Sequence, residues 1–303
     1  MSHKFSVIIS SYNEGEWLEK TVLGVLENTD FPDFEIVVVA DGCTDNSTEF
    51  LHSKDIPNVR LIELPSSVGL ARARNEGAEK STGDFLVFID SHMKPCDANW
   101  LSEVTSQLKK KNVGVATLSI VYLEEPTRVA YIYTVKDLAL EPMWLPPLDH
   151  IHIQYVPVVA GACFALRRDV FQSTGGFDSG LQKWGREDLE YSLRLWRLGY
   201  DLILSPRARI AHSWRRKRTF AVSWDQVDYN ILRTSWTLCS PDFFEKVKTH
   251  LTSLRPQNVK KFLAELIMDT AFDLRRKKLN QSFSRDFDSW CKEFAALLPV
   301  LSI

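Results

Sequence analysis

Asp90, His92 and His212 have the side-chain types of a metal site. The first two follow an apolar run, residues 85–89, that predicts a buried strand. Residues two apart on an extended chain point the same way, so both side chains can reach one ion beyond the carboxyl end of this strand. A carboxylate and two imidazoles suit a divalent cation of the manganese type. The sequence therefore predicts a metal site with Mn2+, or Mg2+, as the ion.

Polar residues also follow two other predicted strands. Ser10, Tyr12 and Glu14 come after the first strand, and Asp41 ends the second. A carboxylate can accept a hydrogen bond from a base imide N–H, and an aromatic ring can stack on a base. Asp41 followed by glycine is also an ordinary turn. Because both segments are expected at the edge that holds the metal site, we favour nucleotide binding.

Arg72 and Arg74 lie near the start of a helix predicted over residues 69–81. Cations in a first helical turn oppose the helix dipole, so a phosphate partner explains them better than stability does. We expect Arg72 to be the functional one of the two. A solvated helix face is the alternative interpretation.

The elements that must position these residues alternate regularly. Strands are predicted at residues 5–9, 34–39, 59–64, 85–89 and 113–118, and helices at 16–28, 45–51, 69–81 and 100–111. Strands buried on both faces and separated by helices predict an α/β fold with a doubly wound, mostly parallel sheet. Ligands of such sheets bind at the carboxyl ends of the strands, where Ser10, Asp41 and Asp90 stand.

The second half of the chain is less regular. Prolines make residues 122–159 a predicted set of loops that cover the site, with one or two strands among them. A helix at 188–198 and short strands at 202–204 and 208–211 are predicted to follow. Amphipathic helices are expected at residues 242–254, 258–277 and 285–298. We therefore divide the chain into a domain at residues 1–218 and a helical C-terminal region at residues 219–303 that could face the acceptor.

The composition of the chain argues against several classes of protein. A net charge of -2 gives no reason to expect nucleic acid as the main partner. Five scattered cysteines, never in a Cys-x-x-Cys pair, are typical of reduced thiols and argue against a disulfide framework. The N-terminus shows no signal-like segment, and no apolar run is long enough to span a membrane. We expect a cytoplasmic protein without an integral membrane segment.

The motifs, in their order, resemble those of nucleotide-sugar glycosyltransferases with the GT-A fold. They are Ser-Tyr-Asn-Glu at 11–14, Asp-Gly-Cys-Thr-Asp at 41–45, Gly-Leu-Ala-Arg-Ala-Arg-Asn at 69–75 and Asp-Ser-His at 90–92. Residues 157–215 are most similar to the polypeptide N-acetylgalactosaminyltransferases, through Ala-Gly-Ala at 160–162, Trp-Gly-Arg-Glu-Asp at 184–188 and His-Ser-Trp-Arg at 212–215. The resemblance covers residues 5–218, and the helical C-terminus falls outside it.

This resemblance implies a role for each matching residue. A metal ion held by Asp90, His92 and His212 would face the diphosphate of a UDP-sugar. The uridine would lie against the segment from Ser10 through Tyr12 to Glu14 and against Asp41, with Arg72 on the nucleotide side. The sugar and acceptor would be lined by residues from the second half of the match: Gly161, Ala162, Trp184 and Glu187.

One departure bears on mechanism. In the N-acetylgalactosaminyltransferases an amide follows the Glu of Trp-Gly-x-Glu, and those enzymes retain anomeric configuration. Here the residue is Asp188, as in inverting galactosyltransferases and chondroitin-polymerising enzymes with Trp-Gly-x-Glu-Asp. We therefore expect an inverting transferase in which Asp188 is the general base beside Glu187. Acidic residues also suit a helix start through capping and the dipole alone, which is the structural alternative.

Other functions stay open at this point. A retaining, N-acetylgalactosaminyltransferase-like transfer and a non-catalytic nucleotide-sugar-binding scaffold are the alternatives. A nucleotidyltransferase is a weaker one, since the N-terminus lacks a Gly-rich triphosphate loop. The acceptor could be a peptide, a polysaccharide or a small metabolite. The basic run at residues 215–218 could close over the diphosphate or be a solvated turn, and His150 and His152 are interpreted as loop residues.

Overall fold

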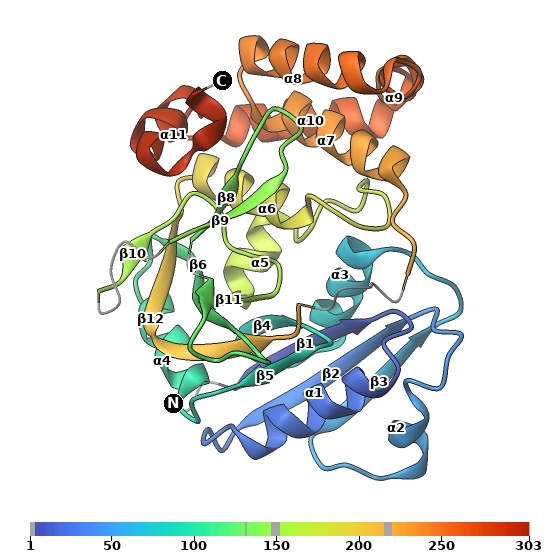
Figure 1. Ribbon diagram of the computed structural model, residues 1–303, viewed down its shortest axis with the longest axis vertical. Coiled ribbons are helices and arrows are strands. Elements are labelled where there is room, and N and C mark those ends of the chain that lie inside the picture. The colour runs from blue at the N-terminus through green and yellow to red at the C-terminus, as the bar shows by residue number, and fades with distance from the viewer. Residues whose placement is uncertain (1–3, 131, 147–151, 215–219, 303) are drawn as a thin grey trace.

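The computed structural model describes residues 4–130, 132–146, 152–214 and 220–302, and a ten-stranded sheet forms its centre (Figure 1). The main path of this sheet runs in the order β10 (Gln154–Tyr155), β12 (Asp201–His212), β6 (Val113–Tyr122), β11 (Cys163–Arg167), β4 (Phe85–Asp90), β1 (Phe5–Ser11), β2 (Phe34–Asp41) and β3 (Val59–Leu64). β5 (Met93–Pro95) pairs with β12, and β7 (Val129–Ala130) pairs with β6.

The sheet is mostly parallel, as the sequence predicts, and has one inserted antiparallel strand. β4, β1, β2 and β3 are parallel neighbours, and so are β6 and β12. β11 lies antiparallel between β4 and β6. In the parallel part Ser10 lies opposite Asp90, so the polar residues after β1, β2 and β4 meet at one edge. The architecture is the GT-A type of α/β fold.

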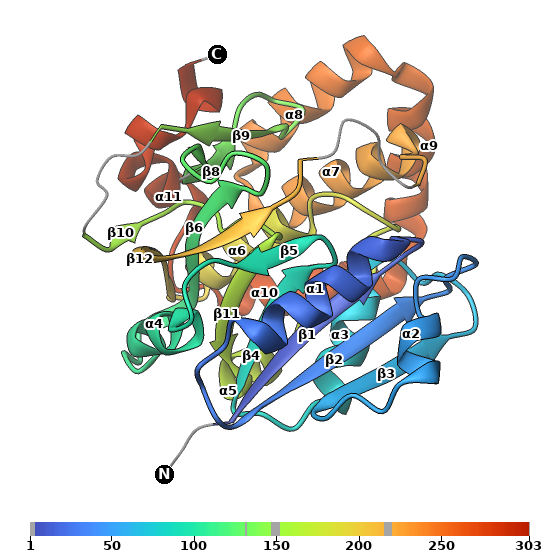
Figure 2. The same ribbon diagram turned by 60° about the horizontal axis from the view of Figure 1, so that its bottom comes forward.

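Helices cover both faces of the sheet. They are α1 (Glu16–Glu27), α2 (Glu49–Ser53), α3 (Leu70–Lys80), α4 (Trp100–Leu108), α5 (Arg168–Thr174) and α6 (Glu187–Arg197). Alternating side chains of β1 belong to different cores: Val7 and Ile9 pack with residues of α1 and α4, while Ile8 packs with residues of α3, α5 and α6. Figure 2 shows α1 and α3 on opposite faces of β1 and β2. This alternation follows from the two-residue period of a strand.

The C-terminal region is helical, as expected, but its boundaries differ from the prediction. It contains α7 (Trp224–Leu238), α8 (Pro241–Leu254), α9 (Pro256–Met268), α10 (Thr270–Ser282) and α11 (Phe287–Glu293). The single helix predicted at 258–277 is two, because Asp269 has extended backbone and its side chain accepts the N–H of Phe272 as the cap of α10. α7 was not predicted at all.

These helices share a core with the sheet. Leu232 of α7, Phe272 of α10 and Trp290 of α11 belong to the same buried cluster as Ile8 and Phe88. In Figure 1 the five helices gather at the end of the molecule away from β2 and β3.

One further feature differs from the sequence interpretation, and one agrees with it. The two short strands predicted at 202–204 and 208–211 are one strand, β12, with an irregular register between Ser205 and Arg209. The proline-rich segment contains a small hairpin of β8 (Ile132–Val135) and β9 (Pro142–Leu145). In the described part of the chain, no helix has the length and apolar character needed to cross a membrane.

Candidate functional site

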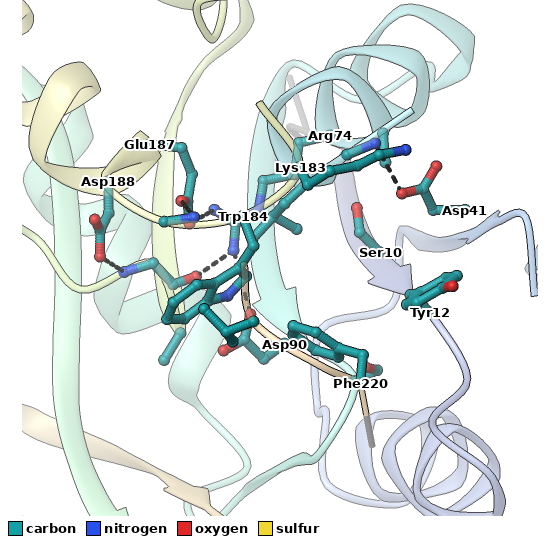
Figure 3. Close-up of a pocket in the computed structure, with 18 of the residues that line it drawn as sticks. Ser10, Tyr12, Asp41, Arg74, Asp90, Lys183, Trp184, Glu187, Asp188 and Phe220 are labelled. Atoms are coloured by element: carbon teal, nitrogen blue, oxygen red, sulfur yellow. Dashed lines mark hydrogen bonds and ion pairs between the residues drawn. The ribbon is translucent and has the colours of Figure 1, made fainter. Parts of the chain in front are cut away.

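A cavity of about 610 Å³ opens at the carboxyl ends of β1, β2 and β4. Residues 183–188, residues 220–223 and the β8–β9 hairpin complete its wall. Figure 3 shows Ser10, Tyr12 and Asp41 on one side, Glu187 and Asp188 on the other, and Asp90 between them. The residues expected to bind a nucleotide and those expected to act on a sugar therefore line the same cavity.

The three predicted metal ligands lie together. One ligand atom each of Asp90, His92 and His212 can be chosen so that all lie within 4.8 Å of one another. His212 Nε2 is 3.7 Å from Asp90 Oδ2, and the two imidazole rings are 4.6 Å apart. The pairing of β5 with β12 explains this, because it sets His212 opposite Met93, the residue after His92. Strand pairing thus brings a ligand 120 residues away in sequence to the end of β4.

The charge state of Asp90 suits a cation ligand. Burial raises the pKa of this carboxyl, but the hydrogen bond with His212 and the charges of His92 and Arg74 outweigh burial and lower the pKa to about 2. Asp90 is therefore ionised at neutral pH.

Glu14 lines the cavity and also contacts one of the predicted metal ligands. It is 4% exposed, and its Oε2 lies 3.4 Å from Nδ1 of His92. A carboxylate on one ring nitrogen of a histidine orients the ring and leaves the other nitrogen for a metal ion. The contact with His92 is one that the sequence did not suggest, and direct contact of Glu14 with a nucleotide stays a prediction.

The choice between the two arginines of α3 was wrong. Arg72 is exposed, lies outside the cavity lining and donates Nε to the carbonyl of Ser179 at 2.7 Å. Arg74 is 2% exposed and donates to Gly161 O at 2.7 Å and Asp90 Oδ1 at 3.2 Å. Its Nη1 also lies 3.4 Å from Glu187 Oε1. Two residues on a helix are about 200° apart, so only one of the pair can face the sheet.

Asp41 binds the loop that precedes α3. Its carboxylate accepts the hydroxyl of Ser67 at 2.9 Å and the backbone N–H groups of Val68 and Gly69 at 2.6 and 3.0 Å. It is 5% exposed and still lines the cavity. Asp41 therefore fixes the segment that leads into α3, and its contact with a nucleotide stays a prediction.

The acidic pair begins α6 and is buried. Glu187 Oε2 accepts the N–H of Gly185 at 3.1 Å, and Asp188 Oδ2 accepts the N–H of Gly161 at 3.2 Å. Burial and then the charge of Asp188 raise the pKa of the Tyr133 hydroxyl on β8. Burial, and then the charge of Asp188, raise the pKa of Glu187 to about 7 against the opposing charge of Arg74.

Gly161 packs closely against the side chains of Glu187 and Arg74. A Cβ at this position would lie 3.3 Å from Glu187 Oε1 and 3.4 Å from Arg74 Nη1. Ala162 lines the cavity, and its carbonyl accepts the N–H of Asp90 at 3.0 Å. Because residues 160–162 are small, their backbone can lie against the charged side chains of Arg74 and Glu187.

Aromatic residues border the cavity on two sides. The ring centroid of Phe220 lies 6.1 Å from that of Tyr12 and 6.3 Å from that of Trp184. Both predicted aromatic contacts, Tyr12 and Trp184, thus line the cavity with Phe220 between them.

Sequence reasoning missed several residues of this site. Lys183 lies beside the recognised Trp-Gly motif and lines the cavity, so its position in the chain could have identified it. Asn230 of α7 holds the backbone of residues 182–185, and no sequence signal links positions so far apart. The basic run from Arg215 to Arg218 and His150 lie outside the described residues.

Comparison with protein families supports the resemblance. Residues 6–175, more than half of the chain, match the model described as glycosyl transferase family 2. Residues 148–215 match the model described as the N-terminal domain of galactosyltransferase.

Curated relatives are polypeptide N-acetylgalactosaminyltransferases. The Xenopus tropicalis enzyme 11 is 30% identical over 278 residues, which cover 83% of this chain and 44% of the relative. The human enzyme 14 is 26% identical over 314 residues, covering 98% of this chain and 54% of the relative. The chain thus spans about half the length of these relatives.

Solved structures share the fold. GalNAc-T7, crystallised with UDP, GalNAc and Mn2+, superposes with a TM-score of 0.76 at 20% identity, covering 98% of this chain and 59% of that one. A mannosyltransferase from Pyrobaculum calidifontis in complex with GDP-Man and Mn2+ gives a TM-score of 0.59 at 17% identity, covering 100% of this chain and 87% of that one.

Proposed function

The chain belongs to glycosyl transferase family 2, and on this premise we propose that it transfers a sugar from a UDP-sugar to an acceptor with a divalent metal ion. The observation that carries the proposal is the convergence of three metal-binding side chains in the cavity that also holds the polar strand ends and the buried acidic pair. Its relative GalNAc-T7 was crystallised with UDP, GalNAc and Mn2+, which supports the same class of donor and ion here.

The residues present fit Mn2+ or Mg2+. Metal–ligand bonds of roughly 2.0–2.6 Å place ligand atoms within about 5 Å of each other, and the 4.8 Å spread of the three groups agrees with that. A bound ion would stabilise the negative charge that builds on the departing diphosphate. Asp90, His92 and His212 would hold the ion, while Glu14 and Arg74 fix the orientations of His92 and Asp90.

The remaining residues divide between donor and acceptor. We propose that Ser10, Tyr12 and Asp41 contact the uridine, and that Gly161, Ala162 and Trp184 border the sugar. The support is their position in one cavity on the two sides of Asp90. Residues 220–223 line the same cavity, which supports an acceptor approaching beside the start of the C-terminal region, residues 219–303.

We propose inversion, with Asp188 as the base that takes the proton of the acceptor hydroxyl while the bond between sugar and diphosphate breaks. The support is an acid where the retaining relatives carry an amide. One observation favours retention instead: the Asp188 carboxylate already accepts the N–H of Gly161. In that case Asp188 would position the sugar-side loop, and the stereochemistry of the product decides between the two.

The proposed function is tested by incubating the chain with a panel of UDP-sugars and following UDP release by mass spectrometry. We expect UDP release that depends on Mn2+. It should fall on the order of 100-fold in His212→Ala, because the loss of a ligand weakens the binding of the ion. His52→Ala is the matched control, since His52 is an exposed histidine outside the cavity lining. UDP release that is undiminished by a chelator would overturn the metal assignment. No UDP release with any donor would overturn the proposal that the chain is an enzyme.

A further inference from the structure

The cavity wall formed by residues 182–185 is held from two sides. The carbonyl of Lys183 accepts the N–H of Leu70, at the start of α3, at 2.7 Å. On the other side, Asn230 of α7 accepts the N–H of Gln182 at 2.7 Å and donates to the carbonyls of Gln182 and Gly185 at 2.8 Å each. Asn230 is fully buried. These hydrogen bonds are made to backbone atoms of the segment, so they set its path independently of its own side chains.

This path presents the Lys183 side chain to the cavity. Its Nζ donates to the carbonyl of Ser67 at 2.5 Å, and the hydroxyl of the same serine donates to Asp41 at 2.9 Å. In Figure 3 the side chain runs from the Trp184 segment toward Asp41. Lys183 is exposed within the cavity lining, so a ligand there can reach the ammonium group.

Lys183 differs from the other Lys and Arg side chains of the cavity in having no carboxylate partner among the described residues. Three Lys or Arg side chains line the cavity within the described residues: Arg74, Lys183 and Arg186. Arg74 is paired with Asp90 and Glu187, and Arg186 with Glu141 at 2.9 Å. Lys183 forms no ion pair with any carboxylate that the structure describes, and its one hydrogen bond is to a neutral carbonyl.

We propose that Lys183 binds a phosphate of the nucleotide diphosphate of the donor. The proposal rests on the proposed function, because it takes a nucleotide diphosphate as the ligand of this cavity. One divalent ion balances the charge of the diphosphate in a UDP-sugar but not the additional negative charge that develops on UDP as the bond to the sugar breaks. An ammonium group on a flexible stem suits that additional charge as a point charge. Asp90 holds the ion on one side of the nucleotide, and Lys183 supplies charge from the other.

A phosphate is a better partner for this group than the nucleobase. A hydrogen bond between an ammonium group and an anion is roughly twice as strong as one between neutral groups, whereas the oxygens of a uracil are neutral. Lys183 already donates to a neutral oxygen in Ser67, so exchange for another neutral oxygen gains little. Exchange of the Ser67 carbonyl for a phosphate oxygen adds an attraction between opposite charges, which is stronger in a partly enclosed cavity than in open water.

The experiment compares the wild-type chain with Lys183→Met, Lys183→Arg and a charge-matched control, Lys260→Met. Lys260 is exposed on α9, outside the cavity lining. Calorimetry with Mn2+ measures the Kd of UDP, NMR titration measures the Kd of uridine, and thermal unfolding checks the fold. The hydrogen bonds that hold residues 182–185 to α3 and α7 use backbone atoms of Gln182, Lys183 and Gly185 and not the Lys183 side chain, so we expect both variants at this position to keep the segment in place.

We expect Lys183→Met to raise the Kd of UDP roughly tenfold and to leave the Kd of uridine unchanged. Lys183→Arg should keep most of the UDP affinity because it keeps the charge, and Lys260→Met should bind as the wild type does. Equal weakening of UDP and uridine would place the contact on the nucleoside and overturn the proposal, and so would unchanged UDP binding by Lys183→Met. If the wild-type chain binds no UDP in the presence of Mn2+, the proposed function fails as well.

Discussion

Arg74 connects the parts of the site at the level of single residues. Its guanidinium contacts the proposed metal ligand Asp90, the carbonyl of Gly161 on the proposed sugar side, and Glu187 of the acidic pair. The side chain is 2% exposed and lies over the rings of Phe164 and Phe177, so its charge is desolvated on every side. A buried cation is tolerated because these carboxylates surround it.

The acidic pair beside Arg74 has two possible roles that one substitution separates. Asp188→Asn removes the base but keeps an oxygen that can accept the N–H of Gly161. If Asp188 takes the acceptor proton, we expect turnover to fall about 10²- to 10⁴-fold while UDP binding stays unchanged. NMR of the glycoside formed from an α-linked donor reports inversion as a β-linked product.

Asp188→Ala is the companion variant, since it removes both the base and the acceptor oxygen. A substantial retention of turnover in Asp188→Asn, with loss only in Asp188→Ala, would contradict the base and leave a positioning role. An α-linked product in the wild type would lead to the same conclusion.

At the level of elements, helix α7 positions a loop of the active site. Its Asn230 makes three hydrogen bonds of 2.7–2.8 Å to the backbone of Gln182 and Gly185, and a longer one of 3.4 Å to the carbonyl of Trp184. One turn further, Arg233 binds Asp178 through two hydrogen bonds. Both contacts tie the same face of α7 to the segment that precedes α6.

We expect Asn230→Ala to lower the free energy of unfolding by about 2–4 kcal/mol, because it leaves several buried backbone groups without partners. Urea denaturation measures this loss. Asn280→Ala on α10 is the matched control, since Asn280 is exposed, and we expect its effect to stay within about 0.5 kcal/mol. Equal midpoints for the two variants would show that α7 does not hold the loop.

At the level of the whole molecule, the sheet and the C-terminal helices share one core. Leu232, Phe272 and Trp290 lie in the same buried cluster as residues of α3, α5 and α6. The division at residue 218, which the end of the family resemblance suggested, therefore separates two stretches of sequence but not two cores. We expect the region after residue 218 to be needed for folding as well as for the cavity wall.

This expectation is tested by ending the chain at residue 218. The shortened chain would expose the apolar face of α6 and lose Asn230, so it should bind a dye for exposed apolar surface and unfold without a sharp transition. Circular dichroism and urea denaturation against the full chain measure this. A cooperative transition in the shortened chain, with bound UDP, would instead support an independent domain at residues 1–218.

Much of this arrangement could be predicted from local sequence. The strands at β1, β2, β3 and β4 and the helices between them follow from periodicity, since apolar spacing is a local property. The break at Asp269 and the continuity of β12 were missed. The apolar period runs on through Asp269, so the helix cap at that residue could not be seen from the spacing. A proline usually ends a strand, but β12 continues past one.

The sequence by itself determined the alternating α/β pattern, the polar residues at the strand ends and the residue types of the metal site. Only the tertiary structure decided which side chains meet. Arg74 and not Arg72 faces the cavity, because helix rotation depends on packing against the sheet. Glu14 turns to His92, and Asn230 reaches a loop about 46 residues away, because contacts between distant segments are set by strand pairing and a shared core.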